Sequence, residues 1–255
     1  HTADRHTGVW LDPGRREAGA ADHRGRTKRV FSLHAISPTW AQVLDIAARV
    51  PATGAKLSPS FSAAARPKDA EAQWTSWRGE VLECAVWWGP LARLRGRSAA
   101  VCRPGAATSV VTESVVTEAD SPAAGPPLAR LADLGPWVYE ADAAVVQARL
   151  TSAVVAATDG VELAGGIGLV TAGRAVDLPI ARRYAVREAM PLHVKAVRAW
   201  LRERGIGRVT VKKRGSPVDP DALRRQLTTK ASGTALLLVT SVAHDTVVLV
   251  LERSE

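Results

Sequence analysis

Apolar and polar residues follow two different periods over the first hundred positions, one typical of strands and one typical of helices. A short apolar run, Gly8–Leu11, stops at Asp12-Pro13-Gly14, which is typical of a buried strand ending at the carboxyl edge of a parallel sheet. Residues 39–50 then carry apolar side chains at helical spacing and predict an amphipathic helix. Its predicted inward face is the set Trp40, Val43, Leu44 and Ala47.

The flanks of this helix predict its ends. Ser37 is a favourable N-cap with Pro38 in the first helical position, and Gly54 is expected to end the helix. Residues 55–61 then predict a short strand. Strand, helix and strand together indicate a βα unit of a parallel sheet with a right-handed crossover.

Strict alternation over residues 71–89 predicts a β-hairpin with its turn at Arg78-Gly79, forming an antiparallel edge. Two hypotheses fit the tryptophans of this hairpin. In the first, these side chains line a pocket together with Glu80 and Glu83. In the second, they cover the sheet, and the usual burial of aromatic residues favours this second hypothesis. The tryptophans concerned are Trp77, Trp87 and Trp88.

The middle of the chain has weaker patterns. Residues 110–117 predict one strand, and the Ser/Pro/Ala/Gly cluster after Asp120 indicates a linker. Asp142 is expected to cap a helix that runs to about Thr158. The sequence Gly165-Gly166-x-Gly168 looks like a cofactor loop, but a strand rather than a helix follows it, so a turn is predicted.

The last third of the chain predicts a compact βαβαββ unit, an α+β layer with helices on one face. Its elements are a strand at 184–190, a helix at 191–204, a strand at 208–214, a helix at 220–227 capped by Asp219, and a hairpin of 235–240 with 246–251. The domain boundaries predicted are 1–102, a connecting region 103–183 with the helix 142–158, and 184–255.

The net positive charge of the chain is concentrated in the same last third. Residues 182–230 hold 14 Lys or Arg and 4 Asp or Glu, a local net of +10, whereas the whole chain has a net charge of +9. So strong an asymmetry predicts a polyanionic partner, and nucleic acid is the first candidate. An acidic protein partner, or a basic face that only meets solvent, are the alternatives. The expected phosphate-binding face consists of Lys195, Arg198, Arg202, Lys212, Lys213 and Arg214.

The run from Leu192 to Leu227, and most specifically VTVKKRGSPVDP, resembles the C-terminal THUMP-like domain of a bacterial family of class I S-adenosylmethionine-dependent methyltransferases. The segments VWLDPGRR and GEVLECAVWWGPLA resemble the catalytic domain of the same family, so the resemblance spans nearly the whole chain. It implies an α/β fold. The C-terminal half of a Rossmann-like methyltransferase sheet would be followed by a small α+β (ferredoxin-like or THUMP-like) domain.

The resemblance also implies a catalytic site at the carboxyl edge. Asp12 and Pro13 take the places of an Asp/Asn-Pro-Pro-aromatic loop that faces the group to be methylated, whereas Gly14 and Arg15 depart from it. Arg15 and Arg16 are predicted to bind substrate by gripping a phosphate. Asp-Pro-Gly is equally good β-turn chemistry, so a plain turn stays open. The family pattern Tyr139, Glu140 and Asp142 is also present, without a predicted role.

The resemblance implies methyl transfer from S-adenosylmethionine to RNA. The cofactor-binding residues are expected upstream of His1, so this chain is expected to lack them and to be inactive alone. The alternative hypothesis is a non-catalytic RNA-binding module. The two cysteines, Cys84 and Cys102, have no metal-ligand spacing, which predicts a cytoplasmic protein without a metal site. No apolar run reaches the length of a membrane span, and the number of subunits cannot be predicted.

Overall fold

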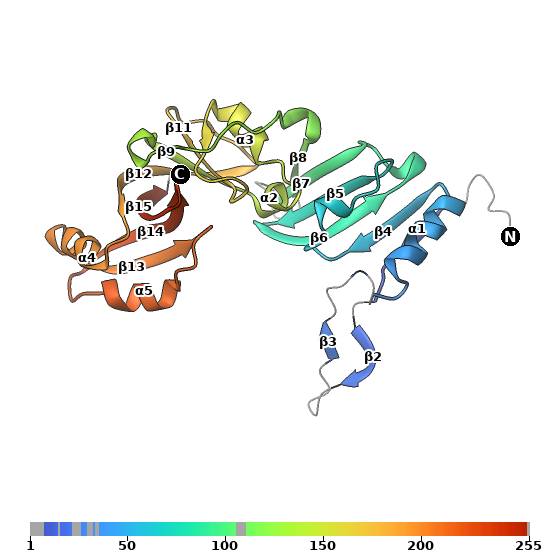
Figure 1. Ribbon diagram of the computed structural model, residues 1–255, viewed down its shortest axis with the longest axis horizontal. Coiled ribbons are helices and arrows are strands. Elements are labelled where there is room, and N and C mark those ends of the chain that lie inside the picture. The colour runs from blue at the N-terminus through green and yellow to red at the C-terminus, as the bar shows by residue number, and fades with distance from the viewer. Residues whose placement is uncertain are drawn as a thin grey trace. The chain divides into compact units, whose positions relative to one another are not determined.

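The chain folds into two compact units, each built around one mixed sheet (Figure 1). The computed structural model describes residues 8–14, 16–21, 27–29, 33, 36–105 and 111–253. Unit 1 contains the described residues up to Ala119 together with Ala143–Leu150, and unit 2 contains Asp120–Asp142 together with the described residues from Thr151 onward. The chain therefore enters unit 2, returns to unit 1, and enters unit 2 again. Residues 103–183, predicted as a connecting region, are divided between the two units.

The sheet of unit 1 has six strands, of which four run parallel. Strands β1, β4, β5 and β7 point one way and β6 and β8 point the other, so the carboxyl ends of β1 and β4 lie at the same edge. Two further strands, β2 (Arg16–Ala21) and β3 (Thr27–Arg29), pair with each other. In spatial order the six strands are β1 (Val9–Leu11), β4 (Thr53–Leu57), β6 (Glu80–Trp87), β5 (Glu71–Trp77), β7 (Gly96–Pro104) and β8 (Val111–Thr117).

Helix α1 (Trp40–Arg49) connects β1 to β4, as the sequence predicts, but its cap differs. Thr39, not Ser37, is the N-cap: its hydroxyl accepts from the Gln42 amide, and the Gln42 side chain accepts from the Thr39 amide. This reciprocal capping box satisfies two amides that the helix leaves unpaired, so it places the helix start two residues later than predicted. Gly54 does not end the helix either; it lies inside β4.

The predicted hairpin of β5 and β6 is confirmed, with its turn at Arg78 and Gly79, both at positive φ. The predicted edge position is wrong, because β7 pairs with β5 on one side and β4 pairs with β6 on the other. Trp88 covers the sheet as the second hypothesis expects, whereas Trp77 is half-buried and the pocket that Trp87 lines includes neither Glu80 nor Glu83. Trp74 and Trp88 are buried and join Trp40 and Phe61 in an aromatic core with ring centroids 5.3 to 6.3 Å apart, whereas Trp87 is only half-buried.

The single helix predicted from Asp142 to Thr158 is in fact two helices. Helix α2 (Ala143–Gln147) buries Ala144 and Val145 against β5, β6 and β7 of unit 1, whereas α3 (Thr151–Thr158) belongs to unit 2. The chain breaks between them at Arg149, whose φ is +57°. The sequence pattern misses the break because residues 143–158 are apolar on both sides of it.

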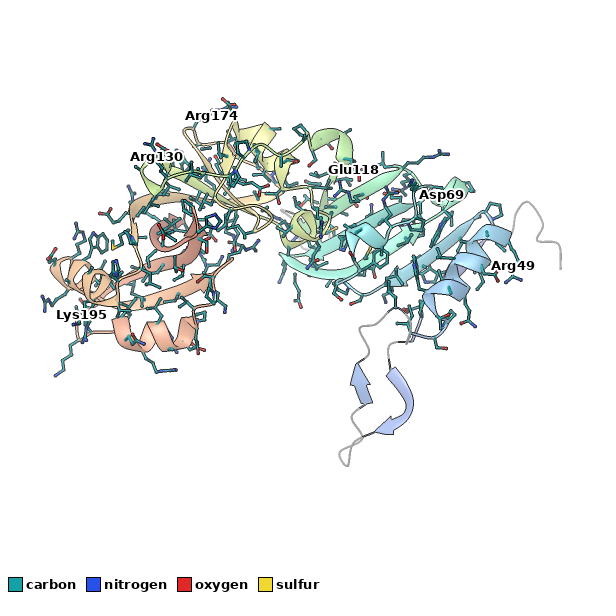
Figure 2. The ribbon with its side chains drawn as sticks, in the orientation of Figure 1. Arg49, Asp69, Glu118, Arg130, Arg174 and Lys195 are labelled. Carbon is teal, nitrogen blue, oxygen red and sulfur yellow. The ribbon has the colours of Figure 1, made fainter. Side chains whose placement is uncertain are left out.

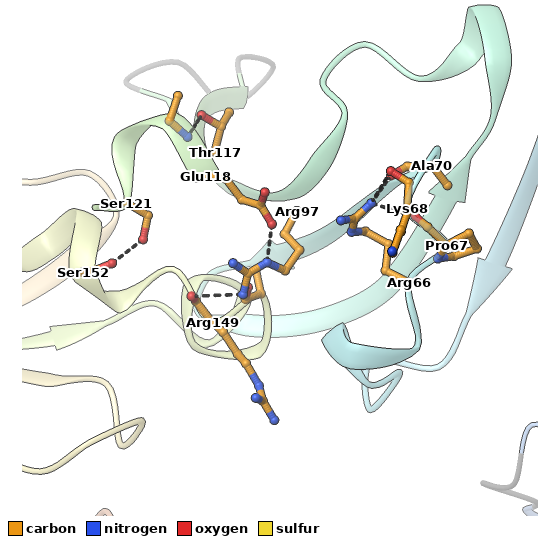
Figure 3. A network of polar contacts seen from close by, with 12 residues as sticks. Arg66, Pro67, Lys68, Ala70, Arg97, Thr117, Glu118, Ser121, Arg149 and Ser152 are labelled. Atoms are coloured by element: carbon orange, nitrogen blue, oxygen red, sulfur yellow. Dashed lines mark hydrogen bonds and ion pairs between the residues drawn. The ribbon is translucent and has the colours of Figure 1, made fainter. Parts of the chain in front are cut away.

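A polar network fixes α2 to unit 1 (Figure 3). The Arg97 guanidinium forms an ion pair with Glu118 and donates to the carbonyl oxygen of Ala148, at 3.3 Å. The hydrogen bond and charge of Arg97 hold the pKa of Glu118 below its usual value despite the opposing effect of burial. Nearby, Arg66 ties its own loop by donating to three backbone carbonyls, those of Pro67, Lys68 and Ala70.

The sheet of unit 2 has seven strands and includes the predicted βαβαββ unit, which is confirmed. Only β13 and β14 pair in parallel. Turn residues 163–168 connect β10 to β11, so the predicted turn at Gly165-Gly166-x-Gly168 is confirmed as well. In spatial order the strands are β10 (Val161–Glu162), β11 (Leu169–Ala172), β9 (Trp137–Ala141), β12 (Ala181–Pro191), β15 (Asp245–Arg253), β14 (Gly233–Val242) and β13 (Ile206–Lys213).

Side chains on the two faces of this sheet form two separate cores. Helices α4 (Val194–Glu203) and α5 (Pro220–Leu227) cover one face through Val197, Leu201 and their neighbours, and both helices lie next to β13 in Figure 1. The other face carries a second core, with Leu169, Tyr184 and Leu238 among its members. Short 3-10 helices complete the fold: η1 (Ala63–Ala65), η2 (Gly89–Leu91), η3 (Glu118–Asp120) and η4 (Leu131–Asp133).

Candidate functional site

Asp12 lies where the sequence predicts it, directly after β1 at the carboxyl edge of the sheet of unit 1. The parallel register of Leu11 with Ala55 brings Asp12 next to Lys56 on β4, and their Oδ2 and Nζ atoms lie 3.6 Å apart. The side chains are 62% and 38% exposed, so the ion pair adds at most about 1 kcal/mol to stability. The carboxylate is therefore open to a ligand.

The backbone after Asp12 is held in place by its contacts with the start of α1. Pro13 is buried, and Gly14 exchanges two backbone hydrogen bonds with Ser37, at 2.7 and 3.1 Å. Ser37 lies just before the Thr39 cap, so this loop is tied to the start of α1. Arg15 lies outside the described residues, as does the side chain of Arg16, and their predicted contacts with substrate stay predictions.

An aromatic pair that the sequence analysis missed lies across β1, β4 and β6 of the same sheet. Trp10 and Trp87 both pair with Gly54 across the sheet, and their ring centroids are 5.0 Å apart. A Cβ on Gly54 would come within 2.7 Å of both rings, so only glycine lets them meet there. Trp10 is 51% exposed. The available signal was its position in β1, two residues before Asp12, because side chains two apart in an extended chain share a face.

A pocket of about 310 Å³ lies elsewhere on this sheet. Its lining includes Glu71 at the amino end of β5 and Trp87 at the carboxyl end of β6, which is the edge opposite to Asp12. The Cys84 thiol is buried in the same sheet, and this burial, together with the charge of Glu83, raises its pKa, so it is no nucleophile at neutral pH.

The predicted phosphate-binding residues of unit 2 do not form one face. Lys195, Arg198 and Arg202 are exposed on the outer side of α4, and we call them the α4 stripe (Lys195 is labelled in Figure 2). Lys213 is exposed and lies on the helix-covered face, since it pairs with Val239 of that core.

Lys212 and Arg214 lie on the opposite face of the sheet, which corrects the predicted single surface. The physical reason is the two-residue period of a strand, which sends Lys212 and Lys213 to opposite faces. Lys212 forms an ion pair with Glu140 and also donates to the Tyr184 hydroxyl, at 3.2 Å. Arg214 lies 3.4 Å from the other Glu140 oxygen and donates to the carbonyl oxygen of Ile167.

Glu140 is therefore the centre of a polar group that we call the Glu140 cluster: Glu140, Arg182, Tyr184, Lys212 and Arg214. Tyr184 donates to Glu140 at 3.0 Å, and Arg182 pairs directly with Glu140 in the register of β12 and β9. Burial alone would raise the pKa of Glu140, but the Lys212 hydrogen bond and the charges of Lys212 and Arg214 outweigh it. The pKa of Glu140 consequently lies below its usual value, and the side chain is ionised at neutral pH.

Tyr139 and Asp142, the other members of the pattern noted in the sequence, lie on either side of Glu140. The Tyr139 hydroxyl donates to the Arg174 carbonyl and accepts from the Val176 amide, so its role is to hold the loop before β12. Asp142 is buried, and its amide donates to the carbonyl oxygen of Ile180. The role of Glu140 was not predictable from the sequence, because its partners are 42 to 74 residues away.

Comparison with known proteins gives one family match and one structural match. Residues 181–253 match a family described as THUMP domain-like. A crystal structure described as "putative methyltransferase from Porphyromonas gingivalis W83" matches with a TM-score of 0.69 at 18% identity, over 96% of this chain and 59% of that chain. The present chain thus spans less than two thirds of its structural neighbour. No curated protein matches the sequence.

These comparisons confirm the predicted fold class: a mixed α/β protein with two mixed sheets and a THUMP-like domain, similar in fold to a protein described as a methyltransferase. None of the described helices is long and apolar enough to cross a membrane. Within the described ranges, no group of three or more His, Cys, Asp or Glu side chains could hold a metal ion.

Proposed function

We propose that this chain serves in S-adenosylmethionine-dependent methylation of RNA, with unit 1 presenting the group to be methylated and unit 2 holding the RNA. The observation that carries the proposal is Asp12, an open carboxylate on a backbone-anchored loop at the carboxyl edge of parallel strands, where ligands of α/β sheets bind. The THUMP-like match of unit 2 and the charge of its α4 stripe support the choice of RNA.

The glycine-rich segment at 165–168 does not fit the cofactor, because it joins two strands, whereas a nucleotide loop precedes a helix. The proposal therefore concerns the substrate side. There the Asp12 carboxylate accepts a hydrogen bond from the amino group or other nucleophile of a base and orients it, which is a positioning effect. A non-catalytic RNA-binding module is the second candidate, because this misfit with the cofactor favours it.

Asp12→Ala separates the two candidates. In the protein as its gene encodes it, we expect methyl transfer from S-adenosylmethionine to RNA to fall by about 100-fold, because a misplaced nucleophile loses that much rate. RNA affinity should stay within twofold. Incorporation of radiolabelled methyl groups measures the first and fluorescence anisotropy of labelled RNA the second, with exposed Asp69→Ala as the matched control. Equal methyl transfer by both variants would contradict the enzymatic candidate.

The proposed binding of RNA by unit 2 is tested separately, by changing the α4 stripe. Changing Lys195, Arg198 and Arg202 to Gln should weaken binding of single-stranded RNA by at least tenfold at 50 mM salt, because fewer phosphate contacts release fewer counterions on binding. The slope of log affinity against log salt should shrink by about 2 for three contacts on a single strand. A control with the same charge loss changes the exposed Lys68, Arg95 and Arg174 to Gln. If both triple variants bind alike, the stripe is no RNA-binding surface.

A further inference from the structure

The Glu140 cluster brings together strands that the sheet order keeps apart. Glu140 is on β9 and Lys212 on β13, with β12, β15 and β14 between them. Four strand spacings in a flat sheet measure about 19 Å, more than two side chains can bridge. The sheet is therefore curled, and the cluster lies on its concave side, on the same face as the core that contains Tyr184 and Leu238.

The cluster holds more positive than negative charge. Three cations, Arg182, Lys212 and Arg214, surround Glu140, and Asp142 is the second carboxylate whose charge acts on Arg182. The hydrogen bond between Arg182 and the Tyr184 hydroxyl, followed by the charges around it, raises the pKa of Arg182. Lys212 uses two of its three N–H groups to bind Glu140 and Tyr184. Each guanidinium carries five N–H groups. The three cations therefore carry more donors than these two partners accept.

These donors are partly withdrawn from water but remain reachable. The side chains of Lys212 and Arg214 are 31% and 26% exposed, and that of Glu140 is 14% exposed. Arg182 is exposed and lies beside Glu140 on the neighbouring strand. A charge interaction in such surroundings is stronger than one on the open surface of α4, because less water screens it. Arg214 also donates to the Ile167 carbonyl in the turn before β11, which ties its segment to that turn.

We propose that Arg182, Lys212 and Arg214 form a binding site for a phosphate group on the concave face of unit 2, in which Glu140 holds the cations in position and competes with the ligand. Guanidinium groups match the geometry of phosphate oxygens, and an ammonium adds a point charge. The choice of phosphate over carboxylate rests on the RNA-binding function proposed above. This site and the α4 stripe lie on opposite faces of the sheet, so they contact different parts of an RNA.

Inorganic pyrophosphate is the probe, titrated by calorimetry into the 255-residue chain at pH 7 and low salt. We expect saturable binding with a dissociation constant of about 1 mM or tighter. Arg182→Gln and Lys212→Met should each weaken it about tenfold, the loss expected for a charged hydrogen bond. Arg187→Gln, an exposed arginine on the same strand β12, is the control and should change nothing.

The direction in which Glu140→Gln changes pyrophosphate affinity distinguishes a binding site from a purely structural cluster. Removing the competing carboxylate should tighten pyrophosphate binding about tenfold, whereas a cluster that only closes the curl of the sheet predicts no gain. Thermal unfolding checks that each variant is folded. If Lys212→Met or Glu140→Gln does not fold, the exposed Arg182→Gln decides. The absence of saturable binding to the wild-type chain, or unchanged binding by Arg182→Gln, would overturn the proposal.

Two RNA oligonucleotides, with and without a 5′-phosphate, identify the source of the phosphate group. A loss of affinity in Arg182→Gln for both indicates a backbone diester, and a loss for the phosphorylated one alone indicates a terminal monoester. If pyrophosphate binds as expected but neither RNA does, the phosphate site stands and the proposed RNA function fails. If both RNAs bind and pyrophosphate does not, the site fails and the RNA function stands.

Discussion

Replacing Glu71 with alanine is expected to lower the free energy of unfolding of unit 1 by about 3 to 4 kcal/mol. The Glu71 side chain is 1% exposed, and its two oxygens accept three hydrogen bonds. Oε2 accepts from the amides of Arg93 and Leu94, at 2.9 and 3.0 Å, and Oε1 accepts from the Ser98 hydroxyl, at 2.7 Å. Alanine removes both acceptor oxygens, so three donors lose their partner, and it leaves a cavity between β5 and β7.

Urea unfolding followed by tryptophan fluorescence measures this loss, because most of the tryptophans, including the buried Trp74 and Trp88, lie in unit 1. Glu71→Gln keeps an acceptor for the two amides and the same shape, so it should lose less than half as much. Asp69→Ala, two residues away and exposed (Figure 2), should change the free energy of unfolding by less than about 0.5 kcal/mol. A loss in Glu71→Ala no larger than that of Asp69→Ala would show that the three bonds are not structural.

Gly207→Ala is expected to destabilise unit 2 by about 3 kcal/mol, which lowers its melting temperature by about 10 °C. A Cβ at position 207 would lie 1.8 Å from the carbonyl oxygen of Ala231. That oxygen belongs to the backbone that leads into β14, and the Gly207 carbonyl in turn accepts from Thr229 at 2.9 Å. Neither segment can move aside without breaking the start of the parallel pair β13–β14.

Gly165→Ala is the matched control in the same unit. It lies in the turn between β10 and β11, and a Cβ there meets nothing within 4 Å. The loss of freedom in the unfolded chain should leave this variant equal to the wild type or slightly more stable. Thermal unfolding by circular dichroism compares the two, and equal melting temperatures would show that the backbone contact at Gly207 is absent.

The sequence predicts those parts of the fold in which a local pattern and the final packing agree. The βαβαββ order of unit 2 follows from periodicity and caps, and Asp219 caps α5 as expected by accepting from the amides of Asp221 and Ala222. Local patterns fail where distant contacts decide. No pattern indicated β7, which fixes the hairpin inside the sheet, and none separated α2 from α3.

The candidate sites show the same limit. The position of Asp12 at an exposed strand end was predictable, because an apolar run that stops at Asp-Pro places the carboxylate outside the sheet. The alternation of side chains along β13 would have placed Lys212 and Arg214 on one face of the sheet and Lys213 on the other. The pairing of Lys212 with Glu140 depends on the curl of a seven-stranded sheet and could not be read from either segment alone.

The return of the chain through α2 has a consequence for the order in which the protein is made. Ala144, Val145 and Leu150 are fully buried, and they reach unit 1 only after the ribosome has passed β9 of unit 2. Unit 1 therefore cannot complete its core during synthesis until the first strand of its neighbour has emerged. The maturation of the two units is linked by the path of the backbone itself.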